Sequence, residues 1–254
     1  MAKPTGKPSF DWRESGRELA IVVLGVFIAL YAQQVVDNWQ WRAKVRTAEA
    51  AMQRELFFDN GPQVYGRAIV HPCLQQRLVA LRAAVDSDNS REKLATLIDG
   101  IQVDFTSYDN LAIQSAFASD IAAHMPQDRL NAYIQAYQMI PTMDRTNALE
   151  AGDLARLRSL PRTGGLLTQE EKGRVLEATD SLRTRDRVMF IAARWTLPTM
   201  RKLGGQLDPA RKQRFMNFAH HYYGTCAKDL PPDWAPQSPF HPDNYRPGRS
   251  LIEE

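Results

Sequence analysis

Cysteine is scarce in this chain of 254 residues, which contains only Cys73 and Cys226. Neither belongs to a Cys-x-x-Cys pair, and the His-Glu-x-x-His helix of zinc peptidases is absent. The Gly-x-Ser-x-Gly turn of serine hydrolases and a phosphate-cradling glycine loop are absent as well. The 14 Gly and 15 Pro follow no fixed period, which excludes a fibrous repeat. No local motif therefore indicates a reaction or a cofactor.

Excess charge is also missing. The chain has 32 Lys and Arg against 29 Asp and Glu, a formal net charge of +3. A binder of nucleic acid normally carries a stronger basic excess, so the charge argues against that class. With 44% hydrophobic and 24% charged residues, the composition is that of an ordinary folded protein.

One long apolar run stands out near the N-terminus. Leu19–Val36 contains no charged residue, and 18 residues in a helix span roughly 27 Å, close to the hydrocarbon thickness of a bilayer. Trp12 precedes the run, and Tyr31, Trp39 and Trp41 stand at its far end, where amphipathic rings favour the headgroup region. The sequence therefore predicts a single transmembrane helix with the lipid bilayer as its partner.

Two other interpretations of this run stay open. It is also compatible with a cleaved signal peptide, although cleavage after Ala32 would place Leu30 where a small residue is preferred. It is only just long enough to span, so a helix buried in a soluble core is the other alternative.

The cysteines decide the predicted orientation, because charge does not. Four basic residues precede the run and four follow it closely, so the positive-inside rule is balanced. Cys73 and Cys226 both follow the run, and an even pair fits a disulfide in an oxidising compartment. The alternative is two buried thiols acting as small apolar side chains. We expect the disulfide, a cytoplasmic N-terminus and a periplasmic C-terminal domain in the bacterial inner membrane.

The rest of the chain has the spacing of amphipathic helices almost throughout. Leu74, Leu78, Leu81 and Val85 share one helix face, whereas only Ile101–Phe105 alternates as a strand would. We therefore predict an all-α fold, in which a transmembrane helix is followed by a soluble helical bundle and a Pro-rich extended arm. The predicted segments are a cytoplasmic head 1–18, the transmembrane helix 19–36, a helical stalk 37–60, the bundle 61–229 and the arm 230–254.

Proline and capping residues predict helix boundaries inside this plan. We expect Gly61-Pro62 to end the helix that continues from the apolar run and Pro72 to begin the next one. Pro141 should split a later helix. Thr168 and Glu171 have the spacing of a capping box and should begin another helix.

Three groups of residues are candidate interaction sites. Gly25 and Ala29 form a small-xxx-small pair that allows two membrane helices to approach closely, and Gln33 could hydrogen-bond across such a homodimer. A second group lies along one predicted helix and could face an anionic partner, although pairing with nearby carboxylates would leave it an ordinary solvated face; it comprises Arg183, Arg187, Arg194 and Arg201. The third group is His220-His221, which could hint at a metal site. Their side chains diverge by about 100° on a helix and do not converge on one ion, so we expect a packed or interfacial histidine pair instead.

Three segments carry a resemblance to known sequences. RELAIVVLGVFIALYAQQVVDNW (Arg17–Trp39), HPCLQQRLVALRAAV (His71–Val85) and ASDIAAHMPQDRLNAYIQAY (Ala118–Tyr137) resemble uncharacterised single-pass membrane proteins of proteobacteria. The resemblance covers about half of the chain and is most distinctive in the first segment. It implies an N-terminal anchor and a helical exported domain, and it assigns no catalytic residue.

From these features we expect a non-enzymatic scaffold or interaction protein of the cell envelope, with an unidentified envelope protein as partner. The alternative is a periplasmic ligand-sensing bundle that acts through a separate signalling partner, because residues 1–18 are too few for an output domain. An envelope enzyme with a triad assembled from distant residues is the third hypothesis.

Overall fold

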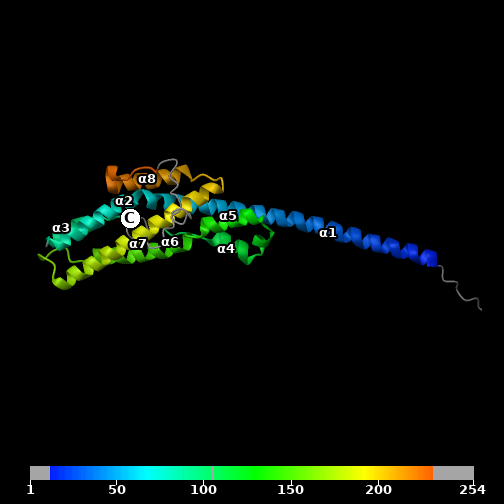
Figure 1. The fold of residues 1–254 in the computed structure, drawn as a ribbon, viewed down its shortest axis with the longest axis horizontal. Coiled ribbons are helices and arrows are strands. Elements are labelled where there is room, and N and C mark those ends of the chain that lie inside the picture. Colours follow the sequence, from blue (N-terminus) through cyan, green and yellow to red (C-terminus); the bar gives the residue numbers. More distant parts are fainter. Residues whose placement is uncertain (1–11, 88, 104–105, 231–254) are drawn as a thin grey trace, which may run out of the picture. The chain divides into compact units, whose positions relative to one another are not determined.

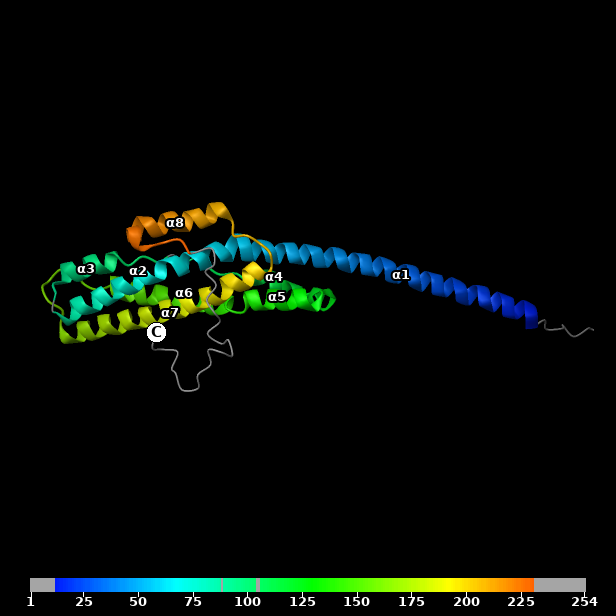
Figure 2. The same ribbon diagram turned by 45° about the horizontal axis from the view of Figure 1, so that its top comes forward.

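The computed structural model describes residues 12–87, 89–103 and 106–230, which are almost entirely helical (Figures 1 and 2). These residues contain no strand, so the predicted all-α class is confirmed. The Pro-rich arm falls outside the described residues except for Leu230. The elements are α1 (Trp12–Arg54), a π-helical turn (Glu55–Asn60), α2 (Gly61–Asp86), α3 (Arg91–Asp99), α4 (Leu111–Ala118), a 3₁₀ turn (Ile121–His124), α5 (Gln127–Tyr137), α6 (Ile140–Arg158), α7 (Gln169–Lys202), α8 (Pro209–Tyr223) and a second 3₁₀ turn (Gly224–Cys226).

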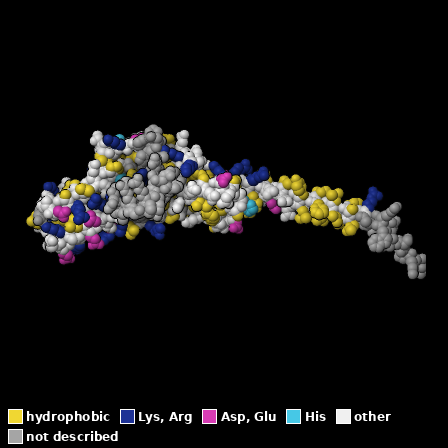
Figure 3. Space-filling model, viewed as in Figure 1, with side chains coloured by type: hydrophobic (Ala, Val, Ile, Leu, Met, Phe, Trp, Pro, Cys, Tyr) yellow, Lys and Arg dark blue, Asp and Glu magenta, His cyan; other side chains and the backbone are white. Residues whose placement is uncertain are grey.

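The chain forms two compact units, Met1–Thr47 and Ala48–Glu254. In the first unit, α1 carries the apolar run. The large apolar side chains of this run are all exposed, the least being Val23 at 44% and the most Tyr31 at 71%. Apolar side chains dominate this helix in the face seen in Figure 3. An 18-residue window here has a mean hydropathy of 2.3 with none of it buried, so the helix is long and apolar enough to cross a membrane. Because this window is fully exposed, it does not form the buried core helix of a soluble domain, which was one of the alternatives.

The second unit is a helical bundle built around α2, α6 and α7. Helix α7 packs against both α2 and α6, and α8 covers another side of α2 (Figures 1 and 2). The stripe predicted on α2 is buried, with Leu74, Leu78 and Leu81 fully inaccessible. Short α3 contacts α2 and α6, whereas α5 packs against α7.

The predicted helix end at Gly61-Pro62 is wrong, because a π-helical turn carries the chain through it. The amide of Gly61 donates to the carbonyl of Leu56, five residues earlier, which is the hydrogen bond of a π turn. Pro62 then occupies the first turn of α2, where a missing amide hydrogen costs little. The helical path therefore continues from α1 into α2.

The predicted helix start at Pro72 is also wrong, since Pro72 lies inside α2. A proline within a helix costs about 3 kcal/mol because it lacks a donor and crowds the preceding turn. The neighbouring Cys73 and Leu74 are buried in the bundle core. Tertiary packing of the α2 face therefore outweighs the local cost.

The other predicted boundaries are largely confirmed. Pro141 lies in the first turn of α6, directly after the break that ends α5. The capping box of Thr168 and Glu171 begins α7, and the side chain of Asp208 caps α8. Helix α4 has only eight residues, and its first turn is capped by a side chain distant in sequence. There the Oε2 atom of Glu55 accepts a hydrogen bond from the amide of Ala112 at 3.0 Å.

The two cysteines are paired as predicted. Cys73 of α2 and Cys226, just after α8, lie with their Cα atoms 5.8 Å apart, within the range that a disulfide requires. The pair joins residues 153 positions apart in the sequence and holds the end of α8 against α2.

Candidate functional site

The π-helical turn frees a backbone group that positions the segment between α7 and α8. In a π turn the carbonyl of Phe57 would accept from residue 62, but Pro62 has no amide hydrogen. The carbonyl of Phe57 accepts instead from the amide of Asp208, at 3.0 Å. Close packing supports this bond, because a Cβ atom on Gly205 would overlap the ring of Phe57. The α7–α8 segment is therefore fixed against the start of α2.

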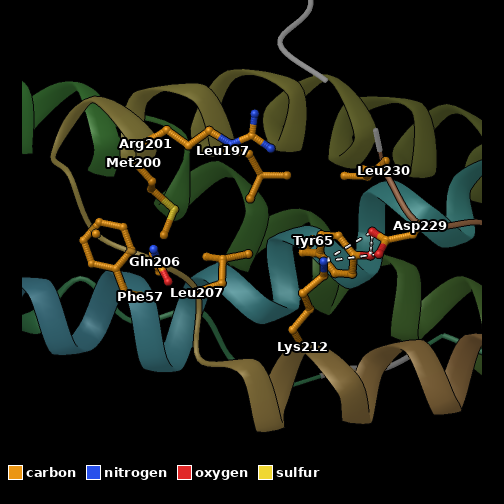
Figure 4. Close-up of a pocket in the computed structure, with 11 residues that line it drawn as sticks. Phe57, Tyr65, Leu197, Met200, Arg201, Gln206, Leu207, Lys212, Asp229 and Leu230 are labelled. Carbon is orange, nitrogen blue, oxygen red and sulfur yellow. Dashed lines mark hydrogen bonds and ion pairs between the residues drawn. The ribbon is translucent and has the colours of Figure 1, made fainter. Parts of the chain in front are cut away.

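A cavity of about 640 Å³ lies between α2, α7, α8 and this segment, and we name it the α2–α7–α8 pocket (Figure 4). Its apolar walls come from elements far apart in the sequence. Phe57, Leu197 and Met200 are buried, whereas Leu207 and Leu230 are partly exposed. In Figure 4 Phe57, Met200 and Leu207 lie together at one end, with the amide of Gln206 beside them, so this end of the pocket is mainly apolar.

The other end of the pocket is polar and centres on Asp229 (Figure 4). The hydroxyl of Tyr65 donates to Oδ1 of Asp229 and also lies 3.1 Å from the sulfur of Met216. The Nζ atom of Lys212 lies 3.3 Å from the same carboxylate and 4.6 Å from the centre of the Tyr65 ring. Three side chains from α2, α8 and the chain beyond α8 therefore form one hydrogen-bonded group.

The electrostatics of this group keep its carboxylate ionised. Burial raises the pKa of Tyr65 strongly, and the hydrogen bond and charge of Asp229 add to the effect, so the phenol stays protonated. Partial burial tends to raise the pKa of Asp229, but the hydrogen bonds from Tyr65 and Lys212 outweigh it and lower that pKa. At neutral pH the polar end thus holds a carboxylate and an ammonium that balance each other.

Of the four predicted surface arginines, the structure places only Arg201 at the pocket. Arg183 is partly exposed, with Nη1 3.9 Å from the Asp180 carboxylate. Arg187, one turn after Arg183, is partly exposed. The guanidinium of Arg194 lies 5.8 Å from the centre of the Phe190 ring. The four arginines are spread over several turns of α7 and therefore do not form one compact anion-binding site.

A second polar cluster lies inside the bundle, and sequence reasoning missed most of it. Arg67 of α2 reaches α6, where its Nη2 atom donates to Asn147 and lies 2.5 Å from Oε2 of Glu150. His71 Nδ1 and Gln75 Nε2, on the following turns of α2, lie 2.6 Å and 2.7 Å from Oδ2 of Asp186 on α7. These contacts tie α2 to both of the helices that it packs against.

The signal for this cluster was present in the spacing of α6. Met143, Leu154 and Leu157 repeat with the four- and three-residue steps of a core face, and Asn147 and Glu150 occupy the intervening core positions. Polar residues at core positions indicate a buried network, and both are buried. Burial raises the pKa of Glu150 to about 7, because desolvation and the charge of Asp186 outweigh the guanidinium of Arg67.

The remaining predicted residues lie at the surface. Gly25, Ala29 and Gln33 are exposed on α1, and a Cβ atom on Gly25 would meet nothing within 4 Å. His220 and His221 are exposed in the last turn of α8, where the ring of His221 packs edge-on against Tyr222. Among the described residues, no group of three or more His, Cys, Asp or Glu side chains is arranged to hold a metal ion.

Comparison with known proteins gives no relative from which a function could be transferred. No family model, curated protein or solved structure matches the chain.

Proposed function

We propose that this protein is a single-pass protein of a bacterial inner membrane that presents a helical, non-enzymatic ligand-binding domain to the periplasm. The observation that carries the proposal is the α2–α7–α8 pocket. Its volume of about 640 Å³ lies in the range of small-molecule sites, roughly 300–1,000 Å³. Apolar walls with a few convergent polar groups are typical of such sites. A ligand signal would then pass to a separate partner protein.

Helix α1 and the cysteine pair support the location. Exposed apolar side chains over Leu19–Val36 are costly in water and favourable in lipid. Disulfides persist in oxidising compartments, so the paired Cys73 and Cys226 favour the periplasm for the bundle.

Two measurements test this location. The protein should stay in the membrane pellet after a carbonate wash, and release into the supernatant would contradict the anchor. Alkaline phosphatase fused after Glu254 should be active because it folds only outside the cytoplasm. An inactive fusion would indicate the opposite orientation, provided that the phosphatase is active when it is fused to a known exported protein in the same cells.

Native mass spectrometry of the full-length protein, released from detergent micelles, tests the binding proposal. Part of the protein should carry a retained small molecule. Leu207→Trp fills the apolar end and should remove it, whereas Ala210→Trp adds the same ring to an exposed site outside the pocket and should not. Equal retention in both variants, or none in the natural protein, would contradict the proposal.

A scaffold function is the second candidate, and it is supported by exposed apolar side chains on α4. Leu111 and Phe117 are 67% and 50% exposed. A contiguous exposed apolar patch is typical of protein-binding surfaces, so this function requires the two side chains to contribute to one such patch. Cross-linking in intact cells, compared between the natural protein and a Leu111→Ser/Phe117→Ser variant, tests it. An unchanged set of cross-linked products would remove this surface from consideration.

A further inference from the structure

We propose that one face of α1 binds an anionic phospholipid, whose phosphate lies between the guanidinium groups of Arg42 and Arg46. The inference rests on the membrane span of the proposed function, but not on the α2–α7–α8 pocket or on the orientation of the span. Three properties of α1 carry it: the order of residue types along this face, the direction in which its side chains lean, and the placement of the nearest carboxylates.

Five residues of α1 share one narrow face, which we name the lipid face: Ile28, Val35, Trp39, Arg42 and Arg46. At about 100° for each residue, their side chains fall within an arc of about 60°. Ile28, Val35 and Trp39 are 61%, 50% and 66% exposed, and both arginines are exposed as well. The face therefore changes from apolar to aromatic to basic, which is the order of acyl chain, interface and head group in a lipid leaflet.

The helical rise brings the basic end of the lipid face to the head groups. Arg42 and Arg46 follow Val36, the end of the apolar run, by about 9 Å and 15 Å along the axis. The head-group region extends roughly 5–7 Å beyond the hydrocarbon. Helix side chains lean toward the N-terminus, which here is the side of the bilayer, so both long side chains reach back toward the phosphates.

The spacing of the two arginines suits one phosphate. Residues four apart are neighbours on a helix surface, with Cβ atoms roughly 5–6 Å apart. Each guanidinium can donate two parallel hydrogen bonds to phosphate oxygens, so the pair can hold one phosphate from two sides. A zwitterionic lipid also brings an ammonium group close to these cations, which repel it. The pair therefore favours a phospholipid with a net negative charge.

The nearest carboxylates leave the lipid face positive. Asp37 is the only acidic residue in positions 19–47, and it lies about 140–180° around the helix from the two arginines. Glu49 follows Arg46 by three residues, but its Oε1 atom lies 3.1 Å from Nε of Arg129 on α5. The charge of Glu49 is thus already paired.

Lys44 supplies a matched control, because it lies between the two arginines in sequence but on the opposite side of α1. Its side chain points about 160–200° away from theirs and about 20° from that of Asp37. Its Nζ atom lies 4.2 Å from the centre of the Trp41 ring. Removing this charge therefore tests whether the lipid recognises one face or the helix as a whole.

Native mass spectrometry of the full-length protein in detergent micelles tests the inference. The protein is titrated with phosphatidylglycerol or with phosphatidylcholine of the same acyl chains, and the bound fraction gives each affinity. Phosphatidylglycerol should bind more tightly. Arg42→Gln and Arg46→Gln should each weaken its binding about fivefold, the effect of one basic side chain at a membrane surface. Lys44→Gln should change it little.

Other results would overturn the inference. Equal affinity for the two lipids would show that the charge of the head group is not recognised. Equal losses in Lys44→Gln and Arg42→Gln would show a general attraction to the helix and no site on one face. Unchanged binding in the double variant Arg42→Gln/Arg46→Gln would place the lipid elsewhere.

A variant of the pocket separates this inference from the proposed function. Leu207→Trp should leave the binding of phosphatidylglycerol unchanged, and a loss there would place the lipid in the α2–α7–α8 pocket instead. Release of the protein by a carbonate wash would remove both the span and the lipid face. A protein that stays in the membrane but does not prefer phosphatidylglycerol would contradict the lipid face alone.

Discussion

The guanidinium of Arg67 and the carboxylate of Glu150 lie 2.5 Å apart, with side chains 6% and 0% exposed. A buried ion pair adds little net stability compared with apolar residues of the same size, but breaking one leaves a buried charge without its partner. This pair therefore makes the α2–α6 contact sensitive to single substitutions.

Above pH 7, where the Glu150 carboxyl is ionised in the natural protein, Arg67→Met should destabilise the protein by up to about 3–5 kcal/mol, which for a chain of this size lowers the melting temperature by up to about 10 °C. The control is the double variant Arg67→Met/Glu150→Met, which removes both charges and should regain most of the loss. Thermal unfolding of the detergent-solubilised protein, followed by circular dichroism, measures both. A double variant no more stable than Arg67→Met would show that the pair is not the cause.

Stability should also fall as pH rises across the titration of Glu150. Its pKa is about 7 in the folded protein, above its ordinary value of 4.5, so the folded state holds the proton more tightly than the unfolded state does. The resulting stabilisation is complete below pH 4.5 and is lost as pH rises from 4.5 to 7. Relative to Glu150→Gln, which does not titrate, the natural protein should lose stability over that range. A constant difference between the two would contradict the buried carboxyl.

The capping box at the start of α7 gives a smaller, local prediction. The hydroxyl of Thr168 accepts from the amide of Glu171, whose carboxylate accepts from the Thr168 amide at 2.8 Å. Thr168→Ala should cost about 1 kcal/mol by leaving one amide without its cap. Thr184→Ala, exposed in the middle of the same helix, should cost nothing, since alanine is the better helix former. Equal melting temperatures for the two variants would contradict the cap.

The pairing of Cys73 with Cys226 predicts a reductant-sensitive protein. Closing a loop of 153 residues stabilises the chain by about 4–5 kcal/mol on the chain-entropy model. The natural protein should migrate faster on non-reducing than on reducing electrophoresis, and Cys73→Ala should remove the difference. Alkylation of both thiols under denaturing conditions without reductant would show instead that the bond is absent.

Association through α1 predicts an effect of substitutions at Gly25. A side chain at this position meets nothing within the chain, so a change in behaviour would report on a second copy. Gly25→Leu should weaken cross-linking between copies in the membrane by keeping the two backbones apart. Ala20→Leu, on the opposite helix face, is the matched control. Equal cross-linking in both variants would place the contact elsewhere or exclude a dimer.

Local patterns were sufficient to predict much of the fold. The helical class, the capping box at Thr168, the break before Pro141 and the buried stripe of α2 all follow from spacing and from single residues. The errors at Pro62 and Pro72 have different causes. A π turn carries the chain to Pro62, which then lies in the first turn of α2, where a missing amide hydrogen costs little. Packing of the α2 face outweighs the cost of Pro72 inside the helix.

The site was harder to predict because its parts are distant in sequence. Phe57, Tyr65, Lys212 and Asp229 meet only after α8 folds back on α2, and no local pattern encodes that meeting. Of the predicted surface residues only Arg201 lines the pocket. The buried Glu150 had a signal in the heptad spacing of α6, but its partner Arg67 did not.

The bond between Cys73 and Cys226 also determines how the domain responds to a protease. Every peptide bond from Leu74 to Thr225 lies inside one covalent ring, so a single cut there opens the ring without releasing a fragment. The nicked chain keeps its full mass until a thiol reagent is added, when it separates into two pieces. Cleavage by a protease at one loop within the ring can thus leave the helices of the domain still held together.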